Sequence, residues 1–214
     1  MGIALLATSG ASYAVAPANS TLTNTATLTY TGLSTPLTAS VDVTVNLTPS
    51  SPVLSDPAAA TAAENQNSTT VYTITSTANG SDAYNLTSAA PVLNNITGAP
   101  AVTFNQGGPS ITSVTLGATA ASTLQTAGNS VITVPSDGTA DAAVNNIAGG
   151  DTVVINGTVY PVTSVSDNGT VGTITLGSPL AANINPGDLI AEQQSFNVLT
   201  TDVGAVTTTG SPAT

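Results

Sequence analysis

The sequence predicts an all-β protein. Its 214 residues draw mainly on Ala, Val, Thr, Ser, Asn and Gly, with five Tyr, two Phe and no Trp. This composition favours β-branched strands and turns over helices, which rely on Leu, Glu, Lys and Arg. Apolar and polar residues alternate with a period of two along the chain, and no window shows a 3.6-residue apolar stripe. With 41% hydrophobic residues, the chain has enough apolar side chains to fill a core.

A series of short strands is expected, each bounded by Gly, Pro, Asn or Asp, as is typical of antiparallel sheets. In chain order these are Leu22–Thr31, Leu37–Leu47, Val53–Asp56, Thr69–Thr77, Ala83–Ser88, Val102–Phe104, Ile111–Gly117, Val131–Val134, Thr152–Ile155, Thr158–Val165, Val171–Leu176, Leu189–Leu199 and Gly204–Thr208. One small sandwich does not hold so many strands, so we expect more than one β unit.

Two tight hairpins mark a compact unit at residues 129–190. The dipeptides Asn156-Gly157 and Asn168-Gly169 each lie between alternating runs. Asn-Gly favours type I′ turns, in which both central residues have positive φ. The runs "AGGDTVVING" and "NPGDLI" are similar Gly-Asp strand entries near these turns. We expect residues 129–190 to form an inserted small β-barrel-like domain. The alternative is that they are additional strands of one larger sandwich.

The segments on either side of this unit have the pattern of another domain. Residues 49–128 contain a Pro-broken strand followed by "TVYTITSTAN" and "GSDAYNLTS", the opening pattern of an immunoglobulin-like β-sandwich. Residues 191–214 contain "QSFNVLTTDVGAV", which has the pattern of a late strand of the same sandwich. Loop tips tolerate insertions of whole domains. We therefore expect residues 49–128 and 191–214 to form one immunoglobulin-like sandwich around the inserted unit.

Two further segments precede the sandwich. Residues 1–18 contain a short apolar stretch ending in Ser12-Tyr13-Ala14, the small-x-small pattern that precedes signal-peptidase cleavage, although no positive n-region is present. If the segment is retained, it is too short to span a bilayer and is expected to pack as an apolar strand or arm. Residues 19–48 have the pattern of a β-hairpin, which is not stable alone in water and therefore needs a sheet to join.

Three runs, "LTNTATLTYTG", "TASVDVTVNL" and "TVYTITSTANGSDAYNLT", resemble bacterial secreted and surface proteins built from the immunoglobulin-like "conserved repeat domain". The resemblance covers residues 19–90 and 193–208 and is carried by the alternation of Thr, Val and Asn. It implies no catalytic motif. It does imply an order of elements, because in those repeats such a hairpin comes last, after a strand like "QSFNVLTTDVGAV". Here the hairpin comes first.

The charge and the missing residue types exclude several functions. Eleven acidic residues and no Lys, Arg or His give a formal net charge of −11. No surface can then complement phosphate, which excludes nucleic acid and anionic membranes as partners. Without His, Cys, Lys or Arg, nucleophile–base pairs and Schiff bases cannot be built, and no two carboxylates are spaced to suggest a hydrolase. We therefore expect no catalytic residue, no cofactor and no enzymatic activity.

Calcium is the metal that this composition suits, because it prefers oxygen ligands. The calcium candidates are Asp137, Asp141 and Asp151, which flank the entry to the inserted unit, and Asp167, which closes a turn. No EF-hand spacing accompanies them. Asp at turns is explained more simply by its bonding to the local backbone.

Glycans are a second possible kind of ligand. The exposed Asn-x-Ser/Thr sequons that we expect to be acceptors, if glycosylation occurs, are Asn19, Asn67, Asn79 and Asn95.

The displaced hairpin predicts how the protein functions. A sandwich that lacks its last hairpin has open sheet edges and an uncovered core. The hairpin can close its own chain, or it can enter the next subunit and build a head-to-tail homopolymer. An apolar arm left in solvent favours the second arrangement. We expect a secreted structural subunit of an extracellular, pilus-like filament or surface layer, joined by β-strand donation through Ile3, Leu5, Leu22, Leu28, Tyr30, Val41, Val43 and Val45. The alternative is a monomeric cell-surface adhesin or carbohydrate-binding module.

Overall fold

The computed structural model describes residues 16–29, 35–55, 57, 67–88 and 101–201. Every regular element in these residues is a β-strand, so the all-β class is confirmed. The strands of the described residues are β1 (Thr21–Leu28), β2 (Leu37–Thr44), β3 (Val53–Leu54), β4 (Ser68–Thr75), β5 (Asp82–Asn85), β6 (Ala101–Asn105), β7 (Ser113–Leu116), β8 (Ala118–Ala120), β9 (Val131–Pro135), β10 (Ala143–Val144), β11 (Ile147–Ala148), β12 (Thr152–Ile155), β13 (Thr158–Asp167), β14 (Val171–Leu176) and β15 (Leu189–Thr201).

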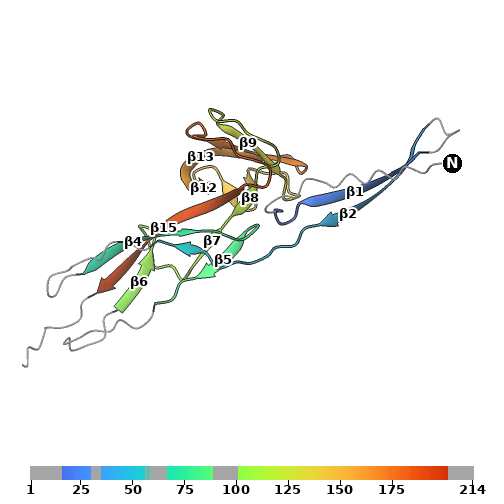
Figure 1. Ribbon diagram of the computed structural model, residues 1–214. Coiled ribbons are helices and arrows are strands. Elements are labelled where there is room, and N and C mark those ends of the chain that lie inside the picture. The colour runs from blue at the N-terminus through green and yellow to red at the C-terminus, as the bar shows by residue number, and fades with distance from the viewer. Residues whose placement is uncertain (1–15, 30–34, 56, 58–66, 89–100, 202–214) are drawn as a thin grey trace, which may run out of the picture.

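Strands β1 and β2 form a separate two-stranded antiparallel sheet that extends away from the other strands (Figure 1). The register pairs Thr21 with Thr44 at the base and Leu28 with Leu37 near the tip. The other strands form a body with two hydrophobic cores. The predicted hairpin at residues 19–48 is therefore present, and it lies outside both cores.

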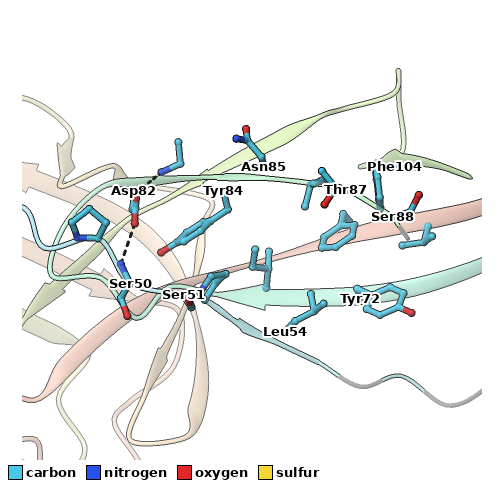
Figure 2. Close-up of a pocket in the computed structure, with 17 residues that line it drawn as sticks. Ser50, Ser51, Leu54, Tyr72, Asp82, Tyr84, Asn85, Thr87, Ser88 and Phe104 are labelled. Atoms are coloured by element: carbon cyan, nitrogen blue, oxygen red, sulfur yellow. Dashed lines mark hydrogen bonds between the residues drawn. The ribbon is translucent and has the colours of Figure 1, made fainter. Parts of the chain in front are cut away.

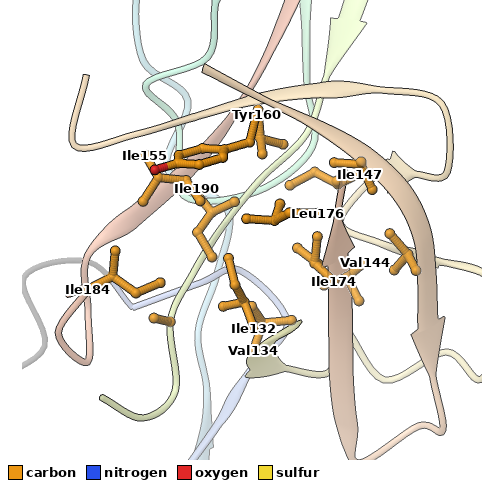
Figure 3. Close-up of a cluster of buried hydrophobic side chains, with 14 of the residues drawn as sticks. Ile132, Val134, Val144, Ile147, Ile155, Tyr160, Ile174, Leu176, Ile184 and Ile190 are labelled. Atoms are coloured by element: carbon orange, nitrogen blue, oxygen red, sulfur yellow. The ribbon is translucent and has the colours of Figure 1, made fainter. Parts of the chain in front are cut away.

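The larger core lies inside a ring of strands (Figure 3). Strands β8, β15, β12, β13, β14 and β9 pair in that order. The amide of Ser122, just after β8, donates to the carbonyl of Thr133 in β9 at 2.9 Å, which brings the two ends of the series together. Alternate residues of each strand point inward, as a period of two requires. The fully buried members of this core include Ile132, Val134, Val144, Ile147, Val153, Ile174 and Ile190.

Three tight turns shape this ring. Asn156 and Gly157 have φ of 48° and 79°, so the positive φ values predicted for a type I′ turn are confirmed. The type I′ prediction for Asn168-Gly169 is wrong in detail. Such a turn needs positive φ at both central residues, and Asn168 is not among the described non-Gly residues with positive φ. Its side-chain oxygen instead accepts from the amides of Thr170 and Val171.

The third turn was not expected from the sequence. Asn145 and Asn146, with φ of 47° and 74°, join the short strands β10 and β11. Asn tolerates this left-handed conformation better than other side chains, so an Asn-Asn pair between apolar residues was a usable signal.

The smaller core lies between two unequal layers. In one layer, the second half of β15 is flanked by β4 and β6, and β3 pairs with the outer edge of β4. In the other layer, among the described strands, β5 pairs with β7 alone. The buried side chains between the layers are Ile74, Tyr84, Val114, Leu116 and Phe196. A four-stranded layer is thus faced by a two-stranded one, and the immunoglobulin-like strand order stays a prediction.

Strand β15 connects the two cores. Its first residues pair with β8 and β12, and its last residues pair with β4 and β6. The bounds expected for the inserted unit, 129–190, contain most of the larger core, but Ala121 also belongs to this core and β8 belongs to the ring through its pairing with β15. Strands β8, β10 and β11 were not expected, and the expected strand Gly204–Thr208 lies outside the described residues.

Candidate functional site

The hairpin has one apolar and one polar face. Because side chains alternate along a strand, the register puts one set of residues on a common face: Leu22, Asn24, Ala26, Leu28, Leu37, Ala39, Val41 and Val43. We call this set the apolar hairpin face. The opposite face consists of Thr21, Thr23, Thr25, Thr27, Thr38, Ser40, Asp42 and Thr44. On that face the hydroxyl of Thr23 donates to the Asp42 carboxylate at 2.6 Å.

The apolar hairpin face is open to solvent. Its large side chains, Leu22, Leu28, Leu37, Val41 and Val43, are 38–58% exposed. A sheet face with this many exposed aliphatic side chains normally packs against another surface. Four of the predicted interface residues, Leu22, Leu28, Val41 and Val43, therefore lie on one uncovered surface.

The other predicted interface residues are placed differently. Val45 is half-buried just beyond β2, where its amide donates to the carbonyl of Ser20 at 2.9 Å. Ile3, Leu5 and Tyr30 lie outside the described residues. Leu37 was missed, although its place in the alternation with Val41 and Val43 was a sufficient signal.

Asn79 fixes the base of the hairpin to the body. Its side-chain amide donates to the carbonyls of Ala16, at 2.9 Å, and Asn46, at 3.1 Å. Its side-chain oxygen accepts from the amide of Thr48 at 2.7 Å. Its backbone carbonyl accepts from the amide of Ala18 at 2.7 Å. One residue thus holds the chain both before β1 and after β2, so the direction of the hairpin is set by the body.

An apolar groove of about 750 Å³ lies beside the smaller core (Figure 2). Leu54 and Tyr72 line one side of it, and Tyr84 and the following residues of β5 line the other. Phe104 and the nearly buried Phe196 line it from the four-stranded layer. The rings of Tyr72 and Phe196 stack with centroids 5.8 Å apart, and Phe104 meets Phe196 edge-on at 6.0 Å. The groove therefore has an ordered aromatic floor.

The groove follows the free side of β5. Its lining includes every residue from Asp82 to Ser88 and none from β7, the partner of β5 on the other side. Among the described strands, none pairs with this second edge of β5. At one end, the Asp82 carboxylate accepts from the amide of Ala83 at 2.9 Å. The groove thus lies where the two-stranded layer would continue over the four-stranded one.

The acidic side chains considered for calcium bond to nearby backbone amides. The carboxylate of Asp137 accepts from Thr139 and Asn145, and that of Asp167 accepts from Asp137 and Gly169. Asp141 and Asp151 accept from Ala143 and Ala148, respectively. In the part of the chain that the structure describes, no three acidic side chains are grouped so that they could hold a metal ion. All four acids have the turn-stabilising contacts that Asp commonly makes.

Glu192 is a buried acid that the sequence analysis missed. It is 1% exposed and lies where the two cores meet. Its carboxylate accepts from the Gly117 amide and from the Gln194 side chain, each at 2.6 Å, and from Asn146 at 3.4 Å. Burial raises the pKa of Glu192 above its ordinary value, and these hydrogen bonds oppose the change. Strand alternation was the available signal, because Glu192 shares a face of β15 with the buried Ile190 and Phe196.

The glycosylation candidates differ in access. Asn19 and Asn67 are exposed. Asn79 is half-buried, and the amide nitrogen that a glycan would modify makes two of the hydrogen bonds at the hairpin base. Asn95 lies outside the described residues.

Comparisons with known protein families, with curated proteins and with solved structures found no match for this chain. The resemblance to the conserved repeat domain therefore stays an expectation. The described residues contain no helix with the length and apolar character needed to cross a membrane.

Proposed function

We propose that the protein is a structural subunit of an extracellular filament or surface layer, in which the hairpin of one copy enters the groove of the next. The observation that carries this proposal is that one chain presents both an uncovered amphipathic hairpin and an apolar groove beside an incomplete layer. Each surface lacks a partner among the described residues, and each has the chemistry that the other needs. Addition of β-structure to a sheet edge is an established mode of protein association.

The position of the hairpin favours contact between copies over closure within one chain. It extends away from the part of the body that contains β4 and β6, which border the groove (Figure 1). The hydrogen bonds of Asn79 hold both of its ends in that direction. Folding back onto the same chain would break these bonds, whereas docking on a second copy keeps them.

The apolar hairpin face supplies an adequate driving force. Fully burying an aliphatic side chain contributes about 1.5–3 kcal/mol. The five large side chains of this face are roughly half exposed, so covering them would contribute about 4–8 kcal/mol in all. The groove side chains and the backbone bonds to β5 would add to this. Because the two surfaces differ, the contact is head-to-tail and repeats from copy to copy, and it produces an open chain of subunits when the rotation between copies does not close a ring.

The composition suits the proposed assembly. Assembly through apolar faces and backbone bonds needs no disulfide or ion pair, and the chain has no Cys, Lys or Arg. The net charge of −11 keeps the unassembled subunit soluble. The partners that we propose are further copies of the same chain, with glycans as a possible addition.

A monomeric adhesin or carbohydrate-binding module remains the second candidate, because the groove is large enough for a small ligand and has aromatic rings in its floor. Phe196 is only 4% exposed and stacks against Tyr72, so it offers little free ring surface to a sugar.

Negative-stain microscopy of the purified full chain tests the proposal. We expect regular fibres at high protein concentration, and dispersed monomers would contradict it. A deletion of residues 1–48 removes the hairpin but no member of either core, so the body should still fold. This variant should not polymerise. When mixed with the full chain it should shorten the fibres, because it offers a groove but no hairpin. Fibres formed by the deletion variant alone would refute donation by this segment.

A further inference from the structure

Along β5, the backbone N–H and C=O groups of successive residues point alternately toward β7 and toward the groove. The Leu86 amide donates to the carbonyl of Thr112 opposite β5, so Leu86 directs its backbone groups toward the β7 side. In an antiparallel pair every second residue does the same, which includes Tyr84. The residues between them, Ala83, Asn85 and Thr87, therefore direct their backbone groups toward the groove. These three side chains are exposed, whereas Tyr84 is buried and Leu86 half-buried.

In the hairpin, too, alternate residues direct their backbone groups toward the outer edges. The Val45 amide donates to the carbonyl of Ser20, so this pair and every second pair after it exchange bonds within the hairpin. The residues engaged in this way belong to the apolar hairpin face, and they include Val41 and Val43. The outer edge of β2 is left to the polar face, through Thr38, Ser40, Asp42 and Thr44. The outer edge of β1 is likewise left to its Thr residues.

These backbone directions favour antiparallel over parallel addition of β2 to β5. Directly opposed residues in an antiparallel pair have side chains on the same face of the sheet. If Asn85 pairs with an outer-edge residue of β2 such as Ser40, both side chains point to solvent. The apolar hairpin face then lies on the same side as Tyr84, over the groove floor. In a parallel pair, a residue whose backbone groups bond to the neighbouring strand lies opposite a residue whose backbone groups point away from it. Asn85 would then lie opposite a residue of the apolar hairpin face. Parallel addition would therefore turn the apolar face outward.

Strand β2 suits the position next to β5 better than β1 does. That position is central in the completed layer, so its inward side chains are the most deeply buried. The inward residues of β2 are Leu37, Ala39, Val41 and Val43, without a polar member. In β1 the same face is interrupted by Asn24. Strands β2 and β4 have eight residues each, which is about 27 Å at 3.4 Å per residue, so the hairpin matches the length of the layer it covers.

We infer that the hairpin of a second copy docks as a two-stranded unit, with β2 antiparallel to the free edge of β5, and so completes a four-stranded layer opposite β3, β4, β15 and β6. This inference rests on the proposed filament function and specifies its joint. The occupant of the groove is a second copy of this chain, and the donated element is the hairpin at residues 19–48.

Pairs of introduced cysteines test the joint, because the chain has no cysteine of its own. Directly opposed residues of an antiparallel pair have Cα atoms about 4.5–5.5 Å apart, within the range of a disulfide. Asn85→Cys is combined in one chain with cysteine at each outer-edge position of β2: Thr38→Cys, Ser40→Cys, Asp42→Cys or Thr44→Cys. Oxidised fibres are run on a denaturing gel without reductant. We expect a ladder of covalent trimers and larger species that peaks at one of these positions.

Matched controls separate the alternatives. Asn85→Cys with Val41→Cys places the second thiol on the opposite face and should not produce the ladder. Asn85→Cys with Thr25→Cys places it on β1 and should also fail. The single variants Asn85→Cys, Ser40→Cys and Thr25→Cys should still form fibres, because these side chains point to solvent in the proposed joint as well as in the subunit. Val41 lies in the joint itself, so fibres of its variant are confirmed by microscopy before oxidation, and a missing ladder is read only from variants that form fibres.

The outcomes distinguish this joint from the filament itself. A ladder from the Val41 or Thr25 pair as strong as that from the best β2 pair would overturn the antiparallel β2 joint. Normal fibres with no ladder from any β2 pair would overturn it too, while leaving the filament function in place. Absence of fibres from the unmodified chain would instead refute the proposed function, and the joint with it.

Discussion

Replacing Val41 and Val43 together by Thr tests whether the apolar hairpin face is buried in the assembled protein. Both side chains are more than half exposed in the subunit, at 58% and 55%, and Thr keeps their shape and β-branching. The stability of the monomer should therefore change little. In the docked state each hydroxyl would be buried without a partner, at a cost of about 1–3 kcal/mol. The pair would cost about 2 kcal/mol or more, which corresponds to roughly 30-fold weaker association.

The assay is the critical concentration for assembly, measured by sedimentation, beside urea unfolding of the monomer. We expect the critical concentration to rise at least about 30-fold while the unfolding midpoint stays the same. The matched control exchanges Thr38→Ser and Ser40→Thr on the opposite face, which conserves composition and should leave assembly unchanged. An unchanged critical concentration for the double Val variant would show that this face is not in the contact. A lowered unfolding midpoint would show that it already packs within the monomer.

Three further predictions concern the body and the charge. Burial raises the pKa of Glu192 in the folded protein, so the free energy of unfolding relative to Glu192→Gln should increase as the pH falls toward the ordinary carboxyl pKa and decrease as the pH rises through the raised pKa. Urea unfolding of both proteins across this pH range measures the difference. Equal pH dependence of the two proteins would contradict the prediction. Gly117→Ala should destabilise strongly, because a Cβ there would collide with the Asn145 carbonyl and lie 2.8 Å from the Ile147 amide; a thermal midpoint near that of the parent would argue against this packing. Added salt should lower the critical concentration, because like charges of −11 per copy repel and salt screens them; a rise measured by sedimentation would indicate that attraction between charges drives assembly.

The strands could be predicted because their signals are local. The alternation in Thr158–Asp167 and the Asn-Gly turn before it follow from side-chain period and positive φ alone. The short strands β8, β10 and β11 have two or three residues each, too few to show a period. Strand β8 forms because it pairs with β15, and β10 and β11 form because the Asn145-Asn146 turn pairs them with each other. The turn at Asn168 differs from the predicted type I′ turn because the side-chain oxygen of Asn168 accepts from two local amides. The Asn-Gly dipeptide alone does not indicate whether these hydrogen bonds form.

The candidate site was only half predictable. The apolar residues of the hairpin were evident from alternation and were assigned to an interface. The groove was not, because Tyr72, Phe104 and Phe196 come from three strands that meet only after folding. The hydrogen bonds between Asn79 and the hairpin base could not be predicted either, because the bonded residues Asn46 and Thr48 are more than 30 residues away in the chain. Its sequon suggested a glycan acceptor, whereas its contacts give it a structural role.

The position of Asn79 determines which part of the subunit would bear mechanical load. Asn79 lies between β4 and β5, and both of these strands also border the groove. In a fibre joined as proposed, tension would enter at the hairpin base, pass along β4 and β5, and leave through the next hairpin in the groove. The ring of strands around the larger core borders this path at one place, where Asn19 and Leu22 of the hairpin base line a pocket together with Pro135 and Gly169. Changes to the ring surface away from this pocket would therefore alter the outside of the fibre without touching the segments that bear the load.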